Sequence, residues 1–489
     1  MIRSLSHRML AKGKTLFVSM TVLGMLAGSF GTVSAAAAPA STEQQLKDIK
    51  ELLSDVHLNG QDLTHSQYAT IEDTLKSLND PYTDYFNEEE WNAFQNSLQL
   101  NYAGIGMRID KEEGGVIAVE VFRDSPAEAA GLQRGDLIIQ VGTVSTANLR
   151  VEQVTQLIRG EEGTEISIRV RRGDQEWDVK PKRKQIQLPV VKGGMMEGNI
   201  GYLDIDSFSA DADEIFAKML DQLKTDQLKG LVVDLRDNPG GLLDTAQHIA
   251  EQFISRGILI HTRDKNNVDE PVLIRNGKTV SFPVVILVNE NSASASELLT
   301  AALQDYKKAI AVGEKTYGKG SVQALYELSS GGVLKVTVQE YLSPNKRTVN
   351  HVGVMPDIVA DGVVPQLLTA LREAGADKLH VEAGKHSYRV NGLEFFDAAI
   401  TALNENGNAF LPARLLASAV GLPLAWDEAA AGVRIGEGNE SQLFDAANGF
   451  VISGGTGYID LSRFSAAYPQ AQWSADAEQT VFTVNVKGK

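Results

Sequence analysis

Three serines and one lysine are the residues best placed for covalent chemistry in this sequence. Ser292, Ser294 and Ser296 follow an apolar run at 284–288, and Lys319 stands between two glycines. A serine hydroxyl becomes a nucleophile when a neighbouring base takes its proton, and a lysine can be that base only in its neutral form. Because the chain has no cysteine, a nucleophile here must use oxygen or nitrogen. The spacing alone does not rank the three serines.

A neutral lysine at position 319 requires burial. Burial lowers the pKa of a lysine from about 10.4 by as much as ~3–5 units, whereas an adjacent carboxylate raises it. Gln323 follows Lys319 on the same face of the chain if this segment is a strand. Its amide is neutral, so Gln323 can orient the amine without raising the pKa.

The turn that carries Ser294 also has a purely structural interpretation. Ser294 and Glu297 have the spacing of a capping box, in which the serine caps the following helix. The same turn exposes the hydroxyl beside backbone N–H groups and the positive end of the helix dipole, which suits a nucleophile. Both interpretations stay open on the residues alone.

An oxyanion formed by serine attack needs preorganised N–H donors, and losing one donor costs roughly 10²–10³-fold in rate. The backbone N–H of Ala295 is one candidate. The other lies in the tight turn DNPGG that follows the apolar run at 230–236, where Gly240 and Gly241 are both candidates. The same residues also make a good plain turn.

Length and charge bound the rest of the molecule. With 489 residues the chain is expected to fold as several domains, each of roughly 60 to 200 residues. It has 46 Lys and Arg against 63 Asp and Glu, a net charge of −17, which argues against broad affinity for nucleic acid or anionic lipid. The eight histidines are scattered, with no HExxH motif, so no metal and no cofactor are expected.

The glycines around Lys319 also approach the pattern of a phosphate-binding loop. Gly313, Gly318 and Lys319 have the required spacing, but Gly320 stands where that loop needs a magnesium-binding serine or threonine. The next residues, SVQALYEL, have the pattern of a strand, whereas a phosphate-binding loop must open a helix. A nucleotide hydrolase therefore has little support.

The N-terminus has the layout of a secretory signal. Cations at positions 3, 8, 12 and 14 precede an uncharged run at 15–40 that ends in SAAAAPA. We expect residues 1–38 to be a signal peptide, cleaved near 36–38. The alternative is an uncleaved signal anchor, which would be the only membrane contact. Either form predicts an exported protein, extracellular or in the cell envelope at the outer face of the cytoplasmic membrane.

Hydrophobic periodicity divides the rest of the chain into segments. They are a helical N-terminal region (39–98), a β-rich domain with one helix (99–183), an alternating α/β domain (184–364), a helical linker (365–387) and a small α+β module (388–489). The default interpretation of the helical N-terminal region is a surface hairpin without a function. The ligand site of the α/β domain is expected at the carboxyl ends of its strands.

The β-rich segment resembles a PDZ domain. The loop YAGIGM at 102–107 stands where a PDZ carboxylate-binding loop precedes the peptide-pairing strand, and SPAEAAGLQRGDLI at 125–138 matches the family's most recognisable turn. Glycine N–H groups can converge on a terminal carboxylate, and the strand edge after them can pair with an extended peptide. The residues that the resemblance places at the substrate are Gly104, Ile105, Gly106 and Met107.

The α/β segment resembles the carboxyl-terminal processing, or tail-specific, serine peptidases. The runs NSASASEL and GKGSVQ carry the resemblance, which extends from about 78 to 357. In that family the middle serine attacks, the lysine of GKG is the base, and a glutamine orients the lysine. The resemblance implies these roles for Ser294, Lys319 and Gln323, in a layered, crotonase-like α/β protease core. Asp305 also fits the family pattern, and we interpret it as structural.

The run AFLPARLLASAVGLPLAWDEAAAGVRI at 409–435 marks the C-terminal module. It resembles the small stalk-like domain related to the N-terminal domain of copper amine oxidases. His386 is the only histidine after His380, so no copper site is expected there. A spacer or surface-attachment role is favoured for this module.

These features together predict a multidomain α/β and β protein with a defined activity. We expect an exported serine endopeptidase with a Ser/Lys dyad, which cleaves proteins near their C-termini after the PDZ-like domain captures the terminal carboxylate. The expected partners are proteins or peptides with apolar or small C-terminal residues, and a homo-oligomer is open. The alternative function is a non-catalytic, PDZ-based scaffolding protein of the envelope.

Overall fold

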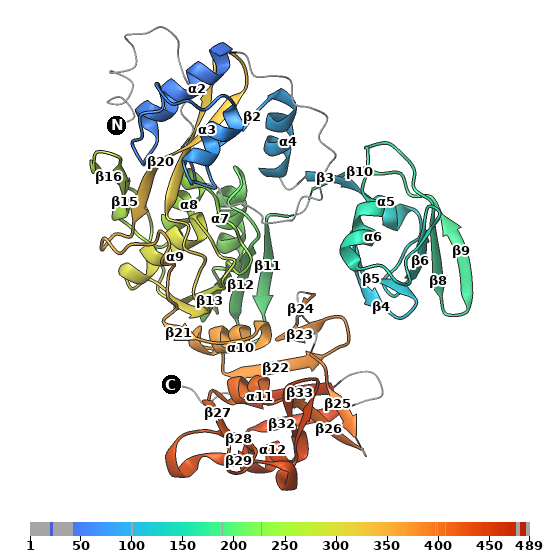
Figure 1. Cartoon of the computed structure of the whole chain (residues 1–489). Helices are drawn as coiled ribbons and strands as arrows, with labels where there is room; N and C mark the ends of the chain where they lie inside the picture. Colours follow the sequence, from blue (N-terminus) through green and yellow to red (C-terminus); the bar gives the residue numbers. More distant parts are fainter. Residues whose placement is uncertain are drawn as a thin grey trace.

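The structure of this protein, a computed structural model, describes residues 20–22, 43–98, 101–187, 189–225, 227–396, 398, 400–405, 407–475 and 480–485. Figure 1 shows an α/β core with the N-terminal helices (blue) at one end and the C-terminal module (red) at the other. A small β-domain (teal) lies beside them. The predicted multidomain α/β and β fold is confirmed.

A six-stranded sheet forms the centre of the α/β core. Its order is β11 (Val191–Met196), β12 (Ile200–Ile205), β13 (Gly230–Asp234), β17 (Val284–Val288), β18 (Ile310–Gly313) and β21 (Ile358–Val359). The strands from β12 to β21 run parallel, and β11 is antiparallel to β12. Both β13 and β17 are buried along their whole length, as expected for strands covered on both faces.

Helices cover the two faces of this sheet. One face packs against α7 (Ala212–Leu223), α8 (Leu243–Ala250) and α9 (Ala295–Asp305), and the other against α10 (Val363–Glu373). Side chains alternate along β13, so Leu231 and Val233 pack with the first group and Val232 packs with α10. The DNPGG turn follows β13 and the serine turn follows β17, at the carboxyl ends of neighbouring parallel strands.

A second, antiparallel sheet carries the segment after Lys319. Its order is β14 (Gly241–Leu242), β1 (Met20–Val22), β19 (Ser321–Glu327), β20 (Val333–Leu342), β15 (Gly257–Asp264) and β16 (Asp269–Ile274), and β2 (Asp84–Phe86) also pairs with β20. The strand predicted after the GKG run is therefore present as β19. A phosphate-binding loop is excluded at Lys319, because the segment that follows it is a strand and not the helix that such a loop must open.

The N-terminal region packs on this second sheet. Its helices are α2 (Glu43–Val56), α3 (Ile71–Ser77) and α4 (Glu88–Leu98). Leu53 and Leu78 share an apolar cluster with Leu334 and Val336 of β20. The predicted helices are present, but they form a wall of the core instead of a separate surface hairpin.

β1 comes from the predicted signal peptide. Its backbone lies between β19 and β14, with Thr21 opposite Gln323 and Val22 opposite Gly241. The rest of the predicted signal peptide and its cleavage site lie outside the described residues. In the part of the chain that the structure describes, no helix is long and apolar enough to cross a membrane.

The small β-domain is a sheet beside one main helix. Its order is β4 (Met107–Glu112), β5 (Gly115–Val121), β6 (Leu137–Val141), β8 (Ile168–Arg172) and β9 (Gln175–Val179), with β7 (Val144–Ser145) paired to β6. The helices are α5 (Pro126–Ala129) and α6 (Val151–Ile158). A ribbon of β3 (Asn101–Gly104) and β10 (Lys184–Gln187) joins the domain to the core (Figure 1).

The stretch at 365–387, predicted as a helical linker, holds most of α10 and also β22 (Lys378–Ala383). β22 lies in a five-stranded sheet with β24 (Leu393–Phe395), β23 (Tyr388–Val390), β33 (Thr480–Asn485) and β32 (Ala471–Ala475). One apolar cluster runs from Tyr202 of the core through α10 to Leu416 and Phe464. The module therefore shares a continuous hydrophobic core with the α/β domain.

The rest of the module is built from short elements around two small sheets. The elements are β25 (Leu403–Glu405), β26 (Asn408–Pro412), α11 (Ala413–Val420), β27 (Leu424–Asp427), β28 (Gly432–Ile435), η1 (Gly438–Glu440), β29 (Gln442–Phe444), η2 (Ala446–Asn448), β30 (Phe450–Ser453), β31 (Thr456–Asp460) and α12 (Leu461–Ala467). This mixture agrees with the predicted α+β module.

Candidate active site

Ser294 lies in the turn between β17 and α9, directly before the helix begins. Its backbone has φ 59° and ψ −113°, a conformation that residues with a side chain rarely adopt and that costs of order 1–3 kcal/mol. The side chain is fully buried, and its Oγ has no hydrogen-bond partner among the described residues. A strained serine with a free hydroxyl at a strand-to-helix turn has the arrangement expected of a nucleophile.

The other two serines of this turn are committed to the backbone. Ser292 Oγ donates to the carbonyl of Leu235 at 2.7 Å, and Ser296 Oγ donates to the carbonyl of Asn238 at 2.9 Å. Each of them ties the serine turn to the segment that holds the DNPGG turn. The geometry thus separates three serines that the spacing left equal.

Glu297 binds the serine turn to the loop that carries Lys319. Its carboxylate accepts the N–H of Ser294 at 2.8 Å, the N–H of Gly318 at 2.7 Å and the N–H of Lys319 at 2.8 Å. It also accepts the hydroxyl of Thr316 at 2.5 Å. Burial raises the pKa of Glu297, and these hydrogen bonds oppose the rise. Only the glutamate half of the predicted capping box is formed, since Ser294 Oγ makes no cap.

Tyr341 on β20 joins the same two segments from a third element. Its hydroxyl lies 2.9 Å from the carbonyl oxygen of Ser294 and 3.0 Å from that of Lys319. The resemblance to the peptidase family includes Tyr341, but sequence reasoning gave this residue no role and gave Glu297 only a capping role. The spacing of Glu297 from Ser294 indicates a helix cap. In contrast, nothing in the sequence near Tyr341 indicates that β20 brings its hydroxyl to both segments.

Lys319 is buried with 2% of its surface exposed, as a neutral base requires. Burial first, and then the positive charge of Lys335, lower the pKa of Lys319 to about 7, against the attraction of Glu297 and Asp80. A substantial fraction of the amine is therefore neutral near pH 7, where general-base catalysis is most effective.

Two glycines let the lysine loop lie against the segment at 349–354. A Cβ at Gly320 would stand 2.3 Å from the backbone nitrogen of Asn350, and a Cβ at Gly353 would stand 2.4 Å from the carbonyl oxygen of Thr316. Larger residues at either position would push the loop outward. The GKG pattern thus has a packing origin here, independent of any phosphate.

Gln323 lies on β19, buried, two residues into the strand from its start. Its Nε2 donates to Ser321 Oγ at 3.0 Å and to Thr337 Oγ1 at 3.2 Å, while its Oε1 has no partner among the described residues. The predicted contact between Gln323 and Lys319 is not among these hydrogen bonds, so the orienting role stays a prediction.

The DNPGG turn lies directly against Ser294. A Cβ at Gly240 would stand 2.8 Å from Ser294 Cβ and 2.9 Å from the nitrogen of Ala295, so only glycine fits. The N–H of Gly240 already donates to Asn238 Oδ1 at 2.8 Å, which leaves Gly241 as the other candidate donor of this turn. Ala295 opens α9, where the first N–H groups have no intrahelical partner.

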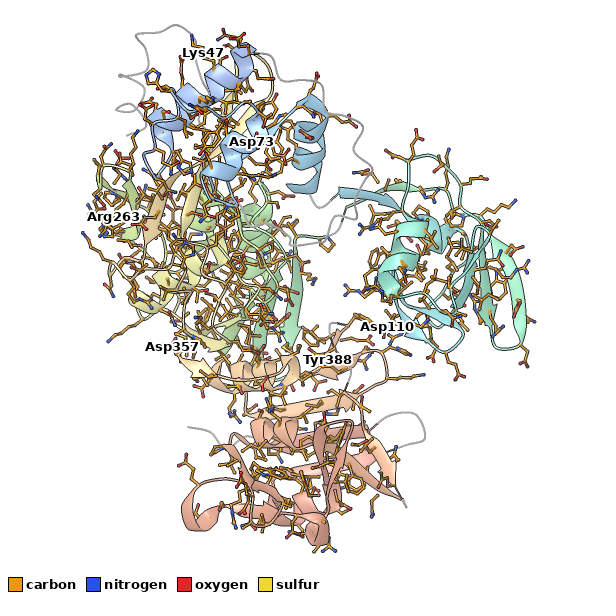
Figure 2. The ribbon with its side chains drawn as sticks, viewed as in Figure 1. Lys47, Asp73, Asp110, Arg263, Asp357 and Tyr388 are labelled. Carbon is orange, nitrogen blue, oxygen red and sulfur yellow. The ribbon has the colours of Figure 1, made fainter. Side chains whose placement is uncertain are left out.

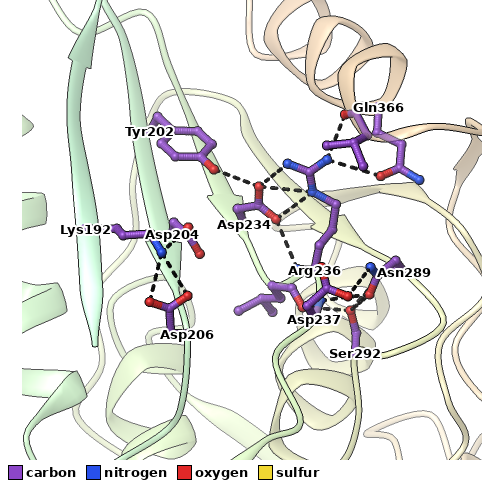
Figure 3. A network of polar contacts seen from close by, with 12 residues as sticks. Lys192, Tyr202, Asp204, Asp206, Asp234, Arg236, Asp237, Asn289, Ser292 and Gln366 are labelled. Carbon is purple, nitrogen blue, oxygen red and sulfur yellow. Dashed lines mark hydrogen bonds and ion pairs between the residues drawn. The ribbon is translucent and has the colours of Figure 1, made fainter. Parts of the chain in front are cut away.

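A polar network holds these turns in place (Figure 3). Asp237 Oδ1 accepts Asn289 Nδ2 at 2.9 Å, and the N–H of Asp237 donates to Asn289 Oδ1 at 2.9 Å. Asp234, at the end of β13, pairs with Arg236, whose Nη1 donates to the carbonyl of Val363 at 2.7 Å. The DNPGG turn is therefore fixed both to the serine turn and to α10.

Asp305 lies at the opposite end of α9 from Ser294. Its carboxylate pairs with Arg347 at 2.7 Å and accepts the N–H of Asn345 at 2.8 Å. These contacts agree with the structural role expected for it. Among the described residues no group of histidine, aspartate and glutamate side chains is arranged to hold a metal ion.

The predicted peptide-binding residues lie at the entrance to β4, the edge strand of the small β-domain. Ile105 is buried, and its carbonyl accepts the N–H of Ala127 at 2.8 Å. Gly106 has φ +79°, and a Cβ there would stand 2.4 Å from Ser125 Cβ. Met107 opens β4 and packs on the domain's apolar cluster, whereas Gly104 ends β3 in the connecting ribbon.

Comparison with known proteins finds a family match for each of two domains. Residues 199–360 match peptidase family S41, and residues 117–172 match the PDZ domain. The chain is 34% identical over 324 residues to a probable CtpA-like serine protease of Staphylococcus aureus (strain COL), covering 66% of this chain and 65% of that relative. It is 35% identical over 293 residues to a protein of the same description from Staphylococcus epidermidis, covering 59% and 60% of the two chains.

The chain thus spans slightly less than two thirds of the length of these relatives. Among solved structures it is similar to the photosystem II D1 C-terminal processing protease, with 25% identity and a TM-score of 0.46, over 68% of this chain and 96% of that one. The resemblance drawn from the NSASASEL, GKG and PDZ motifs is confirmed by the two family matches.

Proposed function

Because residues 199–360 match peptidase family S41 and follow a match to the PDZ domain, we propose that this protein is an exported serine endopeptidase that cleaves proteins near their C-termini. One observation carries the proposal. A buried serine with a free hydroxyl, on a strained turn, is tied through Glu297 to a buried lysine whose pKa is lowered to about 7. A serine and a lysine with purely structural roles need neither an unpaired hydroxyl on a strained turn nor a lowered lysine pKa.

The proposed reaction begins with the neutral amine of Lys319. The amine takes the proton of Ser294 Oγ while that oxygen bonds to the scissile carbonyl carbon, and the carbonyl electrons move onto the substrate oxygen. The N–H groups of Ala295 and Gly241 stabilise this oxyanion. Collapse of the intermediate expels the amine of the C-terminal fragment, which takes its proton from the Lys319 ammonium group.

The second half of the reaction restores the enzyme. The N-terminal part of the substrate remains esterified to Ser294, and Lys319 removes a proton from the water that attacks this ester. Ser294 Oγ leaves with the proton held by Lys319. Gln323 has an unpaired Oε1 with which to orient the amine, and its neutrality leaves the pKa of Lys319 low.

The strand slot between β19 and β14 supports binding of an extended peptide. Residues 20–22 fill this slot with antiparallel backbone pairing, next to Gln323 on one side and Gly241 on the other. A substrate that replaces them would pair in the same way and pass Ser294 and the DNPGG turn. Cleavage of the signal peptide would open the slot, which links the proposed export to activity.

The PDZ domain supplies the proposed choice of substrate. The loop at 104–107 precedes an edge strand, so a C-terminal carboxylate can be held by its N–H groups while the peptide pairs with β4. The proposed recognition signal on the substrate is an apolar or small C-terminal residue. A homo-oligomer is compatible with this way of selecting substrates. Export to the cell envelope follows from the signal-like N-terminus.

Cleavage of an unfolded protein tests the proposal directly. We expect the protein without residues 1–38 to cleave it, and Ser294→Ala and Lys319→Ala each to lose roughly 10⁴-fold or more in kcat. Undiminished cleavage by either variant contradicts the dyad. Absence of cleavage by every form favours a non-catalytic PDZ scaffold. Amidation of the substrate's C-terminus should weaken cleavage, and indifference to it counts against carboxylate capture.

A further inference from the structure

The N-terminal region brings one aromatic ring over the amine of Lys319. The ring belongs to Tyr82, in the turn Asp80-Pro-Tyr-Thr, and Lys319 Nζ lies 4.6 Å from the centre of that ring. The ring therefore covers the nitrogen that must accept a proton in the proposed reaction. Sequence pattern had given this region no function.

Hydrogen bonds fix the turn that carries Tyr82. Asp80 accepts the N–H of Tyr82 at 2.9 Å and the hydroxyl of Thr83 at 2.7 Å, and it lies 3.1 Å from Nε2 of the buried His57. Thr83 Oγ1 in turn accepts the N–H of Thr337 on β20 at 3.0 Å. The position of the ring is thus set by contacts that reach into the second sheet.

The same region covers a second buried lysine in the same way. Lys335 Nζ on β20 lies 5.2 Å from the ring centre of Phe86 and 5.3 Å from that of Phe94. Lys335 is only 3% exposed. Covering buried amines with aromatic rings is therefore a repeated feature of the contact between the N-terminal region and the sheet.

Several charged and titratable groups face Lys319 from the elements around it. Lys335 comes from β20, Glu297 from α9 and Asp80 from the turn, and their charges partly cancel at the amine. Burial, and next the hydrogen bond with the largely exposed Tyr317, raise the pKa of Tyr82, so its hydroxyl stays protonated. Burial is the largest influence on the pKa of Lys319, and the ring of Tyr82 lies over its amine.

We propose that Tyr82 is a positioning residue for the base: its ring closes the Lys319 amine off from water, so the N-terminal region completes the active site. The inference rests on the proposed function, which makes Lys319 the base. A ring face also attracts an ammonium ion and so favours the charged form. Exclusion of water favours the neutral form, by up to ~3–5 pKa units for a fully buried lysine, and burial is the first cause of the lowered pKa of Lys319. In this proposal the cover outweighs the attraction.

The test compares Tyr82→Ala and Tyr82→Phe with a matched control, Tyr68→Ala. Tyr68 is in the same region, with 40% of its surface exposed. Its backbone carbonyl accepts a hydrogen bond from Lys50 Nζ at 2.6 Å, and the substitution leaves that carbonyl in place. One readout is the pH dependence of kcat/KM. The other needs no activity: in a Ser294→Ala background, the rate of acylation of Lys319 by acetic anhydride is measured against pH by peptide mass spectrometry.

Tyr82→Ala should raise the pH midpoint of Lys319 acylation by at least about one unit, with a matching shift of the acid limb of kcat/KM. Each unit lowers the rate tenfold below the midpoint. Tyr82→Phe and Tyr68→Ala should leave both profiles within about twofold of the parent. An unchanged or lower midpoint in Tyr82→Ala, or an equal shift in Tyr82→Phe, overturns the inference.

A second variant keeps the test decisive if Tyr82→Ala does not fold. Thr83→Val removes the hydroxyl that donates to Asp80 within the turn and accepts the N–H of Thr337 on β20. This variant should shift the pH midpoint of Lys319 acylation in the same direction by a smaller amount. An unchanged midpoint in a folded Thr83→Val protein then counts against the inference.

The outcomes separate this inference from the proposed function. If the acylation midpoint shifts as expected but no form cleaves protein, the proposed function fails alone. If the parent cleaves and the midpoint does not move, this inference fails alone.

Discussion

Two sets of polar contacts join distant parts of this chain, and they differ in exposure. In the candidate active site, Glu297 and Tyr341 link the serine turn to the lysine loop, and both side chains are fully buried. Between the PDZ domain and the segment at 385–394, which leads into the C-terminal module, the side chains that pair are partly exposed. Asp110 lies on the side of the PDZ domain that faces the module (Figure 2). The first set is part of the core, and the second joins two surfaces.

The exposed set consists of two Lys or Arg ion pairs and the contacts of one histidine. Lys385 pairs with Glu112 at 2.6 Å, and the two ring nitrogens of His386 lie 2.9 Å from Asp110 and from Glu112. Arg134 of the PDZ domain pairs with Glu394 of the module at 2.7 Å. The hydrogen bond from Lys385 leads the effects that lower the pKa of Glu112 to about 2. Exposed pairs contribute about 0–1 kcal/mol each and weaken with salt, so this contact is suited to release.

The largest effect should come from the buried set. Glu297→Gln keeps the shape but replaces one acceptor oxygen with an amide group, which cannot accept the N–H groups and hydroxyl now shared by the carboxylate. We expect kcat to fall by about 10²-fold, because misplacement by 1 Å at a catalytic centre has that size. The measurement is steady-state cleavage of a peptide.

Glu290→Gln is the control for this substitution, since Glu290 lies exposed in the same turn. It should leave kcat within about twofold, as is usual for exposed positions. Equal kcat values for Glu297→Gln and Glu290→Gln would show that the buried contacts of Glu297 matter no more to the reaction than an exposed carboxylate does.

An intermediate effect is expected from the second buried lysine. The positive charge of Lys335 lowers the pKa of Lys319, so Lys335→Met should raise that pKa. The neutral amine is the reactive form, hence the rate rises with pH through about 7 in the parent and through a higher value in the variant. A rise of about half a unit lowers the rate at pH 6 about threefold and leaves the rate at pH 9 unchanged. A pH–rate profile of kcat/KM that is flat, or shifted downward, would be inconsistent with a neutral base.

The smallest effect should come from the exposed set. The double substitution Glu112→Gln with His386→Gln removes the contacts of Glu112 and His386 and leaves the Arg134–Glu394 pair. We expect a loss of unfolding free energy below about 1 kcal/mol. Small-angle scattering should show a broader distribution of distances between the PDZ domain and the module, as high salt alone should in the parent. Glu72→Gln, at an exposed pair within α3, is the control. An unchanged distribution in the double variant and in high salt would show that the contact is not held by charge.

The local pattern of the sequence predicted the strands and the turns of the site well. The apolar runs at 230–236 and 284–288 became β13 and β17, and the residues that follow each run meet at one edge of the sheet. Burial of Lys319 followed from the chemistry that a neutral amine requires. These predictions depend on neighbouring residues or on a single physical requirement.

The contacts between segments far apart in sequence could not be predicted in this way. Tyr82 meets Lys319 because β2 pairs with β20, and Tyr341 on β20 reaches the carbonyl of Ser294, 47 residues earlier in the chain. The sequence pattern predicts a linker where β22 lies; β22 pairs with the nearby β23 and also with β33, which lies at the other end of the module. The spacing left the three serines equal, and only the resemblance singled out Ser294. The physical distinction is the hydroxyl contacts of Ser292 and Ser296, which are made with a different strand end.

The most direct test of the account is covalent labelling of the nucleophile. A fluorophosphonate probe is incubated with the protein lacking residues 1–38 over a range of pH, and the labelled residue is identified by peptide mass spectrometry. We predict labelling at Ser294 alone, with a rate that rises through about pH 7 and is lost in Lys319→Ala. Labelling at Ser292 or Ser296, or a rate at Ser294 that does not depend on Lys319, would contradict it.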